Sequence, residues 1–310
     1  MRKIALILAL VISGALFAAS SASPGQGHAF EVTIGSGYAS LGYKANNLTG
    51  RLESKTTGSY ALQAHIGYNW FFSRYMGLAI GVDAHHYGQN TALDGLLSWD
   101  GVTDTDGELY EHILELKQWT ERQECWTVEI PLSFVFSIPV SNVLNITAQV
   151  GAKYGLPLSA TYSGHGTLTH TGYYEPWGLT LSDKPNHGFY TEENFRPKGQ
   201  LPHKNYWTVF AKVGIALPLT EQLDMMIQIY ANYAVTSFAE GGQDETIGFR
   251  NDRAGQEQNH YFMNDYISLT NTAIIANPLK PRDIGLELGV RYNISRPKPK
   301  QPCHCLGVYF

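Results

Sequence analysis

From residue 30 onward, apolar and polar side chains alternate with a period of two, the pattern of a β-strand whose two faces meet different surroundings. In residues 126–138, for example, Trp, Val, Ile, Leu and Phe side chains alternate with Thr, Glu and Ser along most of the segment. The pattern predicts eight strands. They cover residues 30–43, 60–70, 76–84, 126–138, 146–158, 207–217, 227–235 and 284–294.

The predicted strands are long, and the connections between them alternate in length. Most strands reach the roughly 9–11 residues of a transmembrane β-strand, against about 5–6 in globular proteins. Short turns at residues 72–75, 141–145 and 220–224 separate long connections at residues 44–59, 88–124, 163–205 and 239–282. Short turns on one rim and long loops on the other are typical of outer-membrane barrels.

The chain is therefore predicted to be all-β: a closed, antiparallel, up-and-down transmembrane β-barrel of eight strands. Its short turns and both termini are expected on the periplasmic side, and its long loops outside the cell. Ten strands remain possible, because residues 261–275 could add a pair. Residues 88–124 could form a hairpin that extends the barrel outward.

The inward face of the predicted barrel carries charges of both signs. Backbone groups inside hydrocarbon must all be paired, so the sheet closes, its outward face is apolar and its inward face can be polar. Unpaired buried charges are costly, so a network of ion pairs is expected rather than an open pore. The alternative is a channel lined by one sign of charge. The predicted lumen polar network is Glu31, His65, Asp83, Glu129, Lys153, Lys212, Glu287 and Arg291, with Gln149 nearby.

Aromatic side chains gather near the ends of the predicted strands, where the two aromatic girdles of a membrane barrel belong. Core packing is the alternative for any single ring. The predicted girdle residues are Trp70, Phe71, Phe72 and Tyr75 at a short turn, with Trp126, Tyr206 and Trp207 at the long-loop side.

Composition and the N-terminus fit this picture. Charged residues make up 16% of the chain, against about 25% in soluble domains. The mean hydropathy is −0.19, and no later apolar run approaches the roughly 18 residues of a membrane helix. Arg2 and Lys3, the apolar residues 4–17 and the small residues up to Ala22 predict a signal peptide, with an anchor helix as the weaker alternative. The net charge of −5 argues against nucleic-acid binding.

Three stretches carry a family resemblance: EIPL at residues 129–132, GAKYGLPLS at 151–159 and GLELGVRY at 285–292. They resemble small outer-membrane β-barrel proteins of Bacteroidota, the PorT-like and OmpA-barrel-like group. The resemblance implies an eight-stranded barrel in the outer membrane but no single activity, since members are structural, secretion-system or adhesion proteins. It carries over no catalytic residue.

The C-terminus departs from the simplest barrel pattern, because three prolines separate Ile294 from the terminal Phe310. The expected organisation is a signal peptide at 1–22, the barrel at 23–294 and a proline-rich periplasmic tail at 295–310. Cys303 and Cys305 would then lie across the membrane from Cys125, too far for a disulfide. Cys303, His304 and Cys305 would supply three metal ligands, but a fourth ligand is missing. A mobile tail is therefore favoured over a metal site.

The search for chemistry yields weak candidates. His85 and His86 would suit a lipid hydrolase only with a nearby Ser and carboxylate, and a structural role is favoured. By the alternation of faces along the strand, His85 faces the lumen and His86 faces lipid. Asp104 to Glu108 could bind Ca²⁺ but also suits a hairpin turn. We expect no catalytic residue, cofactor or metal.

The long loops are the stronger functional candidates, because exposed rings favour contact with protein or glycan. The alternative is that these rings pack over the barrel mouth. The expected partners are outer-membrane lipid and an extracellular protein or glycan; a small porin or a lipid-modifying enzyme is the alternative function. The candidate loop-binding residues are Tyr173, Tyr174, Trp177, Phe189 and Tyr190, with Tyr261 and Phe262 as further rings.

Overall fold

The computed structural model describes residues 27–42, 52–104, 107–141, 143–238, 247–250, 260–263 and 279–294. The predicted signal peptide and the predicted proline-rich tail, with Cys303 and Cys305, lie outside the described residues. Within the described residues, no helix has the length and apolar character to cross a bilayer.

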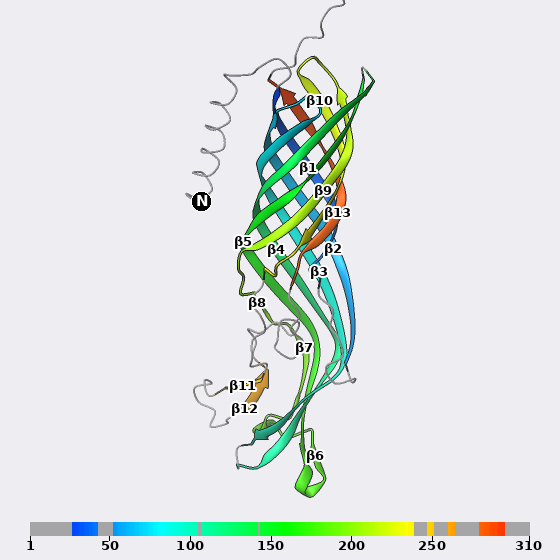
Figure 1. Cartoon of the computed structure of the whole chain (residues 1–310). Coiled ribbons are helices and arrows are strands. Elements are labelled where there is room, and N and C mark those ends of the chain that lie inside the picture. Colours follow the sequence, from blue (N-terminus) through cyan, green and yellow to red (C-terminus); the bar gives the residue numbers. More distant parts are fainter. Residues whose placement is uncertain are drawn as a thin grey trace, which may run out of the picture.

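Eight antiparallel strands close into a barrel (Figure 1). Around the barrel the order is β1, β2, β3, β4, β5, β9, β10 and β13, and β13 pairs back with β1. The predicted closed eight-stranded barrel is thereby confirmed. The bounds are β1 Gly27–Ser40, β2 Leu52–Phe71, β3 Met76–Thr103, β4 Leu109–Ser141, β5 Leu144–Tyr174, β9 Tyr206–Pro218, β10 Leu223–Ala234 and β13 Arg282–Asn293.

The short turns lie together at one rim, and a hydroxyl side chain accepts a backbone N–H in each of them. The Ser73 hydroxyl accepts hydrogen bonds from the backbone N–H groups of Tyr75 and Met76, at 3.2 and 3.1 Å. Thr220 does the same for Gln222 and Leu223, at 3.3 and 3.0 Å. A side-chain acceptor in place of a backbone carbonyl is what favours Ser and Thr in tight turns.

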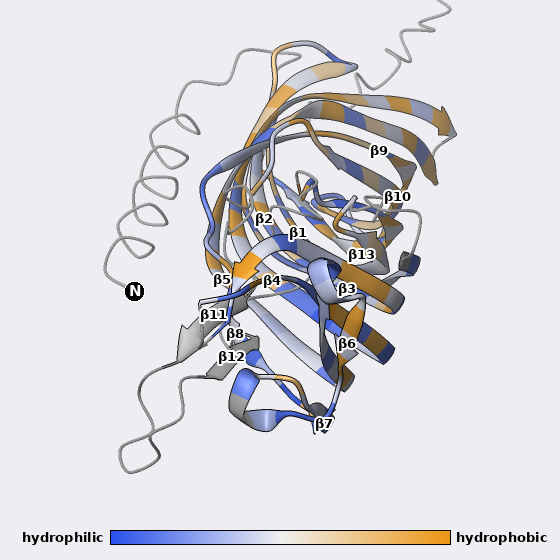
Figure 2. Ribbon diagram, turned by 90° about the horizontal axis from the view of Figure 1, so that it is seen from below, coloured by the Kyte–Doolittle hydropathy of each residue, from blue (hydrophilic) through white to orange (hydrophobic). Residues whose placement is uncertain are grey.

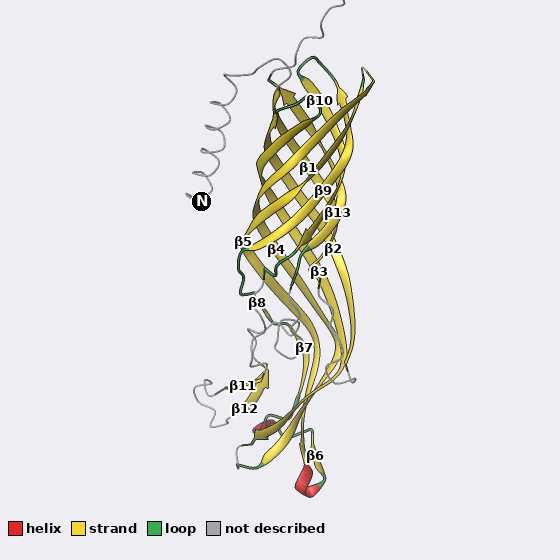
Figure 3. Cartoon of the chain, in the orientation of Figure 1, coloured by secondary structure: helices red, strands yellow, loops and turns green. Residues whose placement is uncertain are grey.

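Three strands continue far beyond the length that a membrane requires (Figure 3). β3, β4 and β5 have 28, 33 and 31 residues, against the roughly 9–11 that span a bilayer. The pairing of β3 with β4 out to Thr103 and Leu109 confirms the predicted outward hairpin. Strands β2 to β5 therefore take up much of the long connections predicted at residues 44–59, 88–124 and 163–205. We call this part of the sheet the extension.

Short elements decorate the extension. Three of them add to the edge of β5, whereas β11 and β12 pair only with each other, so they are not a ninth and tenth barrel strand. Their bounds are η1 Glu175–Trp177, β6 Leu179–Leu181, η2 Pro185–His187, β7 Thr191–Phe195, β8 Lys198–Gln200, β11 Ile247–Arg250 and β12 His260–Met263.

The outward face of the barrel is an apolar belt. Hydrophobic and hydrophilic residues alternate along its strands (Figure 2). Its aliphatic and aromatic side chains are 41–67% exposed, a continuous apolar surface that a water-soluble monomer would not present. A closed ladder with such an exterior is suited to hydrocarbon. The belt includes Val32, Ile34, Ile66, Ile80, Leu132, Phe134, Val150, Val213, Ile229, Leu286, Leu288 and Val290.

The interior consists of two regions of opposite character. At the level of the belt it is filled by buried polar and charged side chains. Inside the extension it is an apolar core, because a sheet with water outside must bury an apolar face. This apolar core includes Leu93, Leu97, Leu114, Leu116, Trp119, Tyr162, Leu168, Phe195, Leu201, Tyr206, Phe238 and Leu279.

Candidate functional site

Lys153 of β5 lies at the centre of the lumen network. Its Nζ is 2.7 Å from Asp83 Oδ2 and 3.3 Å from Glu129 Oε2, and all three side chains are almost completely buried. His65 of β2 binds the other carboxylate oxygen of Asp83 through Nδ1. One ammonium group therefore bridges two carboxylates that come from neighbouring strands.

Two further ion pairs fill the lumen toward β13. Lys212 Nζ lies 3.0 Å from Glu287 Oε1, and the Arg291 guanidinium lies 3.1 Å from Glu31 Oε2. Asn69 donates to the same Glu31 oxygen at 3.0 Å. The structure thus places every charged residue of the predicted network inside the barrel beside an opposite charge. Gln149 also lies there, and donates to the Ser133 hydroxyl at 2.8 Å.

A third polar group surrounds His85, which parity placed in the lumen, and it includes Asp283, which the sequence analysis missed. His85 Nε2 lies 3.1 Å from Asp283 Oδ2, and its Nδ1 lies 3.6 Å from Glu129 Oε2, so carboxylates flank both ring nitrogens. The hydroxyls of Tyr87 and Tyr206 donate to the remaining oxygen of Glu129, at 2.9 and 2.6 Å. Parity along β13 would have found Asp283, because its neighbour Ile284 faces outward.

His86 takes the opposite side of the wall, as parity predicts. Its ring stacks on Tyr60 with centroids 5.0 Å apart and tilts against Trp126 at 4.6 Å, and these two rings bury it on the outward face. Glu124 Oε1 lies 3.7 Å from its Nε2. His85 and His86 therefore cannot cooperate in one reaction, since the barrel wall separates them.

The Asp104 region serves the β3–β4 turn. Asp104 Oδ1 accepts the backbone N–H of Glu108 at 2.9 Å, and Oδ2 accepts the Tyr174 hydroxyl at 2.7 Å. Thr105 and Asp106 lie outside the described residues. Within the described part of the chain, no group of three or more His, Cys, Asp or Glu side chains is arranged to hold a metal ion.

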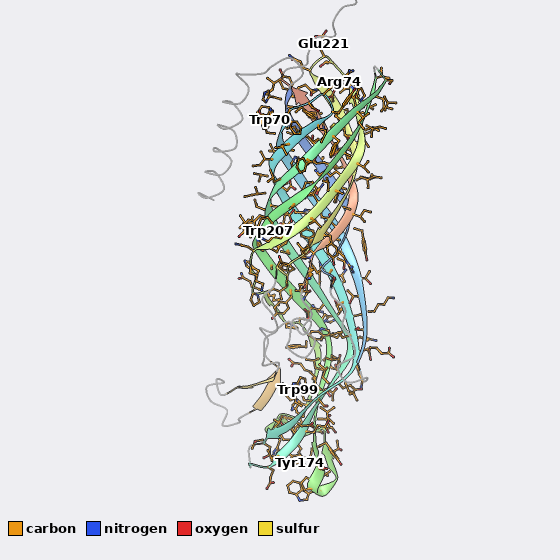
Figure 4. The ribbon with its side chains drawn as sticks, in the orientation of Figure 1. Trp70, Arg74, Trp99, Tyr174, Trp207 and Glu221 are labelled. Carbon is orange, nitrogen blue, oxygen red and sulfur yellow. The ribbon has the colours of Figure 1, made fainter. Side chains whose placement is uncertain are left out.

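Exposed aromatic residues mark both ends of the apolar belt. Trp70 and Trp207 lie at the two levels (Figure 4), and they are 40% and 50% exposed. Phe72 and Tyr75 accompany Trp70 at the short turns, and Trp126 is exposed on the outward face of β4. Two aromatic girdles bounding an apolar belt on a closed sheet define the hydrocarbon zone. The chain is a transmembrane β-barrel.

Two predicted girdle residues point into the barrel instead. Tyr206 is fully buried, with its hydroxyl on Glu129, and Phe71 is half-buried with the Arg291 guanidinium 5.8 Å from its ring centre. The prediction for both was wrong because neighbours in a strand point to opposite faces. Trp207 and Trp70 take the outward positions, so Tyr206 and Phe71 must face inward.

The far end of the extension, which we call the distal tip, has a small core of its own. It is built where the β3–β4 turn, the end of β5, η1, β6 and η2 meet. Tyr174 and Phe189 are buried there against Tyr110. These two rings are therefore unavailable for binding, contrary to the prediction. The structure places Tyr173 and Tyr190 at half-buried positions, and the side chains of Tyr261 and Phe262 lie outside the described residues.

Trp177 is the ring that the distal tip presents to solvent. It is 59% exposed and stacks on Tyr174 with a centroid distance of 5.5 Å and an interplanar angle of 29°. Glu175 and Pro176 begin the single 3₁₀ turn that carries it, and Gly178 ends that turn in the left-handed region at φ 57°. Only glycine adopts this conformation without strain, so the local sequence fixes where the ring points.

Two buried histidines lie side by side in the distal tip. His112 Nε2 is 3.1 Å from His170 Nδ1, and the Tyr110 hydroxyl is 3.2 Å from His112 Nδ1. Burial lowers the pKa of His112 to about 4. Burial, and then the nearby His112, lower the pKa of His170 to about 3. Both imidazoles are therefore neutral in the folded tip at neutral pH.

We expect the distal tip to lose stability as the pH falls from about 6.5 through about 4. In this range the two histidines bind protons in the unfolded chain but stay unprotonated in the folded tip. Above about 6.5 the pair contributes no pH dependence. Near-ultraviolet circular dichroism of the tip rings at about pH 7.5 and about pH 4.5 measures the effect. A double variant, His112→Phe with His170→Phe, should keep its signal in acid, and a wild-type signal that does not change with pH would contradict the expectation.

No protein-family model and no curated protein matches the chain. Among solved structures, the chain is similar to Neisserial surface protein A at 11% identity, covering 85% of this chain and 97% of that one, with a TM-score of 0.33. For OprG of Pseudomonas aeruginosa the identity is 10%, the match covers 87% of this chain and 95% of that one, and the TM-score is 0.33. Ail of Yersinia pestis was solved with the heparin analogue sucrose octasulfate. Its identity is 10%, the match covers 86% of this chain and 98% of that one, and the TM-score is 0.26. Such distant likenesses leave the ligands of this chain open.

Proposed function

We propose that the protein is a non-enzymatic bacterial outer-membrane barrel that anchors the extension outside the cell and presents the distal tip to a partner. The observation that carries the proposal is that β3, β4 and β5 run far past the Trp207 girdle and end in an ordered tip (Figure 4). In this orientation the short turns and both termini are periplasmic. The PorT-like resemblance of the strand motifs agrees with such an anchoring barrel.

The interior of the barrel supports anchoring rather than transport. A channel needs a continuous aqueous path, whereas the belt-level lumen is occupied by cross-strand ion pairs. Above them the apolar core of the extension follows, with Trp119 and Phe238 fully buried. Ions would have to cross both regions. The barrel therefore suits a rigid mount for the extension.

Trp177 is the residue on which we place the partner contact. A large ring already fixed by stacking on Tyr174 loses little conformational freedom on binding, which is why exposed aromatic residues dominate many recognition surfaces. Exposed polar side chains, Glu175 and Asp183 among them, lie on the same segment and could supply hydrogen bonds. This combination suits an extracellular glycan or protein.

Replacing Trp177 with Ala is expected to lower binding at least tenfold, a loss of about 1.4 kcal/mol or more, as for a central interface ring. The purified protein, held in detergent, is applied to an array of glycans and extracellular-matrix proteins, and retained protein is measured. Leu109→Ala is the matched control, because Leu109 is also exposed, on the β3–β4 turn. If Trp177→Ala binds every probe as the wild type does, the tip contact is refuted.

Display of the tip is tested separately by treating intact cells with trypsin. The exposed Lys198 and Lys204 lie between the distal tip and β9, and neither is followed by proline, so trypsin should cut after them while the barrel strands stay intact. Cutting at these sites only after the outer membrane is opened would reverse the proposed orientation.

A further inference from the structure

A hollow lies in the lipid-facing wall of the barrel. A groove of about 800 Å³ crosses the outward face of β9, β10, β13 and β1 near the long-strand rim. Its floor holds Ala211 and Ala231, which pair directly across β9 and β10. Larger outward side chains border the floor: Val150, Val209, Tyr233, Ile284 and Tyr38. Two alanines in register, where neighbouring rows carry larger side chains, create the depression.

One border of the groove is fixed in place. The Tyr38 ring lies over Gly58, where an added Cβ would come within 2.4 Å of the Tyr38 Cζ. The backbone N–H of Gly58 donates to the Tyr38 hydroxyl at 2.7 Å. The ring is thus held across the β1–β2 pair, so this side of the groove keeps its shape when lipids exchange around the barrel.

The two ends of the groove differ in polarity. Val150 and Ala211 line the end that lies in the apolar belt. At the rim end, Arg282 begins β13 and is exposed on the outward face, between its register partners Tyr233 and Ser40. Thr56 completes this end. An apolar slot that leads to a cation at the membrane surface is complementary to an anionic amphiphile.

We propose that this groove is a specific site for one phosphate-bearing, multi-acyl lipid of the leaflet at the long-strand rim. One acyl chain lies over Ala211 and Ala231, and a headgroup phosphate binds the Arg282 guanidinium, whose planar fork suits phosphate oxygens. Given the orientation in the proposed function, this is the outer leaflet. The same site requires both the slot and the cation, which separates it from general contact with lipid.

Native mass spectrometry of the purified protein in detergent tests the site. The probes are hexa-acyl lipid A with its phosphates, the same lipid without phosphates, and inorganic phosphate alone. We expect the wild type to retain one phosphorylated lipid. Ala231→Phe fills the floor and should lower retention at least tenfold, and Arg282→Gln should lower it about tenfold by removing a charge-assisted bond.

Two matched variants control for changes elsewhere on the wall. Ala84→Phe adds the same ring to an outward alanine of β3, and Arg122→Gln removes an exposed arginine on β4, and both should retain lipid as the wild type does. Heat-modifiable electrophoresis confirms that each barrel is folded, and Ala211→Phe provides a second floor variant.

Three results would overturn the lipid site: equal retention of the dephosphorylated lipid, competition by inorganic phosphate alone, or equal losses in the control variants. The measurement involves neither cells nor the distal tip. A tip that binds no partner therefore leaves it unchanged, and a reversed orientation would alter only the leaflet.

Discussion

Replacing Lys153 with Met should lower the free energy of unfolding by about 3–5 kcal/mol, because breaking a buried ion pair leaves an uncompensated charge in a dry interior. Here one ammonium lies 2.7 Å from Asp83 and 3.3 Å from Glu129, so its loss strands two carboxylates. Methionine keeps much of the chain length, which limits the effect to charge. Urea titration in lipid vesicles, followed by tryptophan fluorescence, gives the change.

A surface pair provides the control for this loss. Lys117 lies 3.0 Å from Glu115 in the extension but is 56% exposed, so Lys117→Met should cost less than about 1 kcal/mol. A triple variant, Lys153→Met with Asp83→Asn and Glu129→Gln, should regain part of the stability by removing the stranded charges. Equal effects of Lys153→Met and Lys117→Met would show that the lumen network does not hold the barrel together.

Replacing Trp119 with Ala should destabilise the extension by about 3–5 kcal/mol while the barrel stays folded, as expected for removing a large buried ring. Trp119 is fully buried in the apolar core, and Gly164 and Gly166 leave the space that its ring occupies. Its centroid lies 6.1 Å from that of Phe195. The apolar core meets the lumen network at Tyr206, whose hydroxyl donates to Glu129, whereas Trp119 packs against the strands of the extension, so its loss is expected to act first on the extension.

Two measurements on the same sample distinguish these regions. Trypsin digestion in detergent should cut the extension of Trp119→Ala faster than that of the wild type, whereas heat-modifiable electrophoresis should still report a folded barrel. Trp177→Ala, which changes an exposed tryptophan, should digest at the wild-type rate. Loss of the barrel together with the extension would show that the two form one cooperative unit.

The polar lumen and the apolar core of the extension explain how one sheet can be stable both in lipid and in water. At the belt, lipid takes up the apolar outward face, and opposite charges on facing strands satisfy the inward one. Beyond the Trp207 girdle, water replaces lipid outside, and the sheet holds together as a soluble protein does, by burying leucines and aromatic rings such as Trp119 and Tyr162. The extension can therefore project far from the membrane without losing its shape.

The sequence by itself determined the closed barrel, its eight strands and the identity of its charged interior. A period of two is a local property of a strand, so parity alone placed residues such as Glu129 and Lys153 inward and Leu132 outward. Parity also contained the corrections: Tyr206 and Phe71 had to face inward once Trp207 and Trp70 faced lipid.

Only the tertiary structure decided which charges meet and where the strands end. Lys153 pairs with Asp83 and Glu129, and Lys212 with Glu287, because closure and register bring those strands face to face, and no local pattern encodes register across a lumen. The sequence predicted the β3–β4 hairpin but not the packed interior of the extension, for a related reason. Its strands bury Tyr174 and Phe189 through contacts between segments distant in sequence, so nothing local distinguished packed rings from exposed ones.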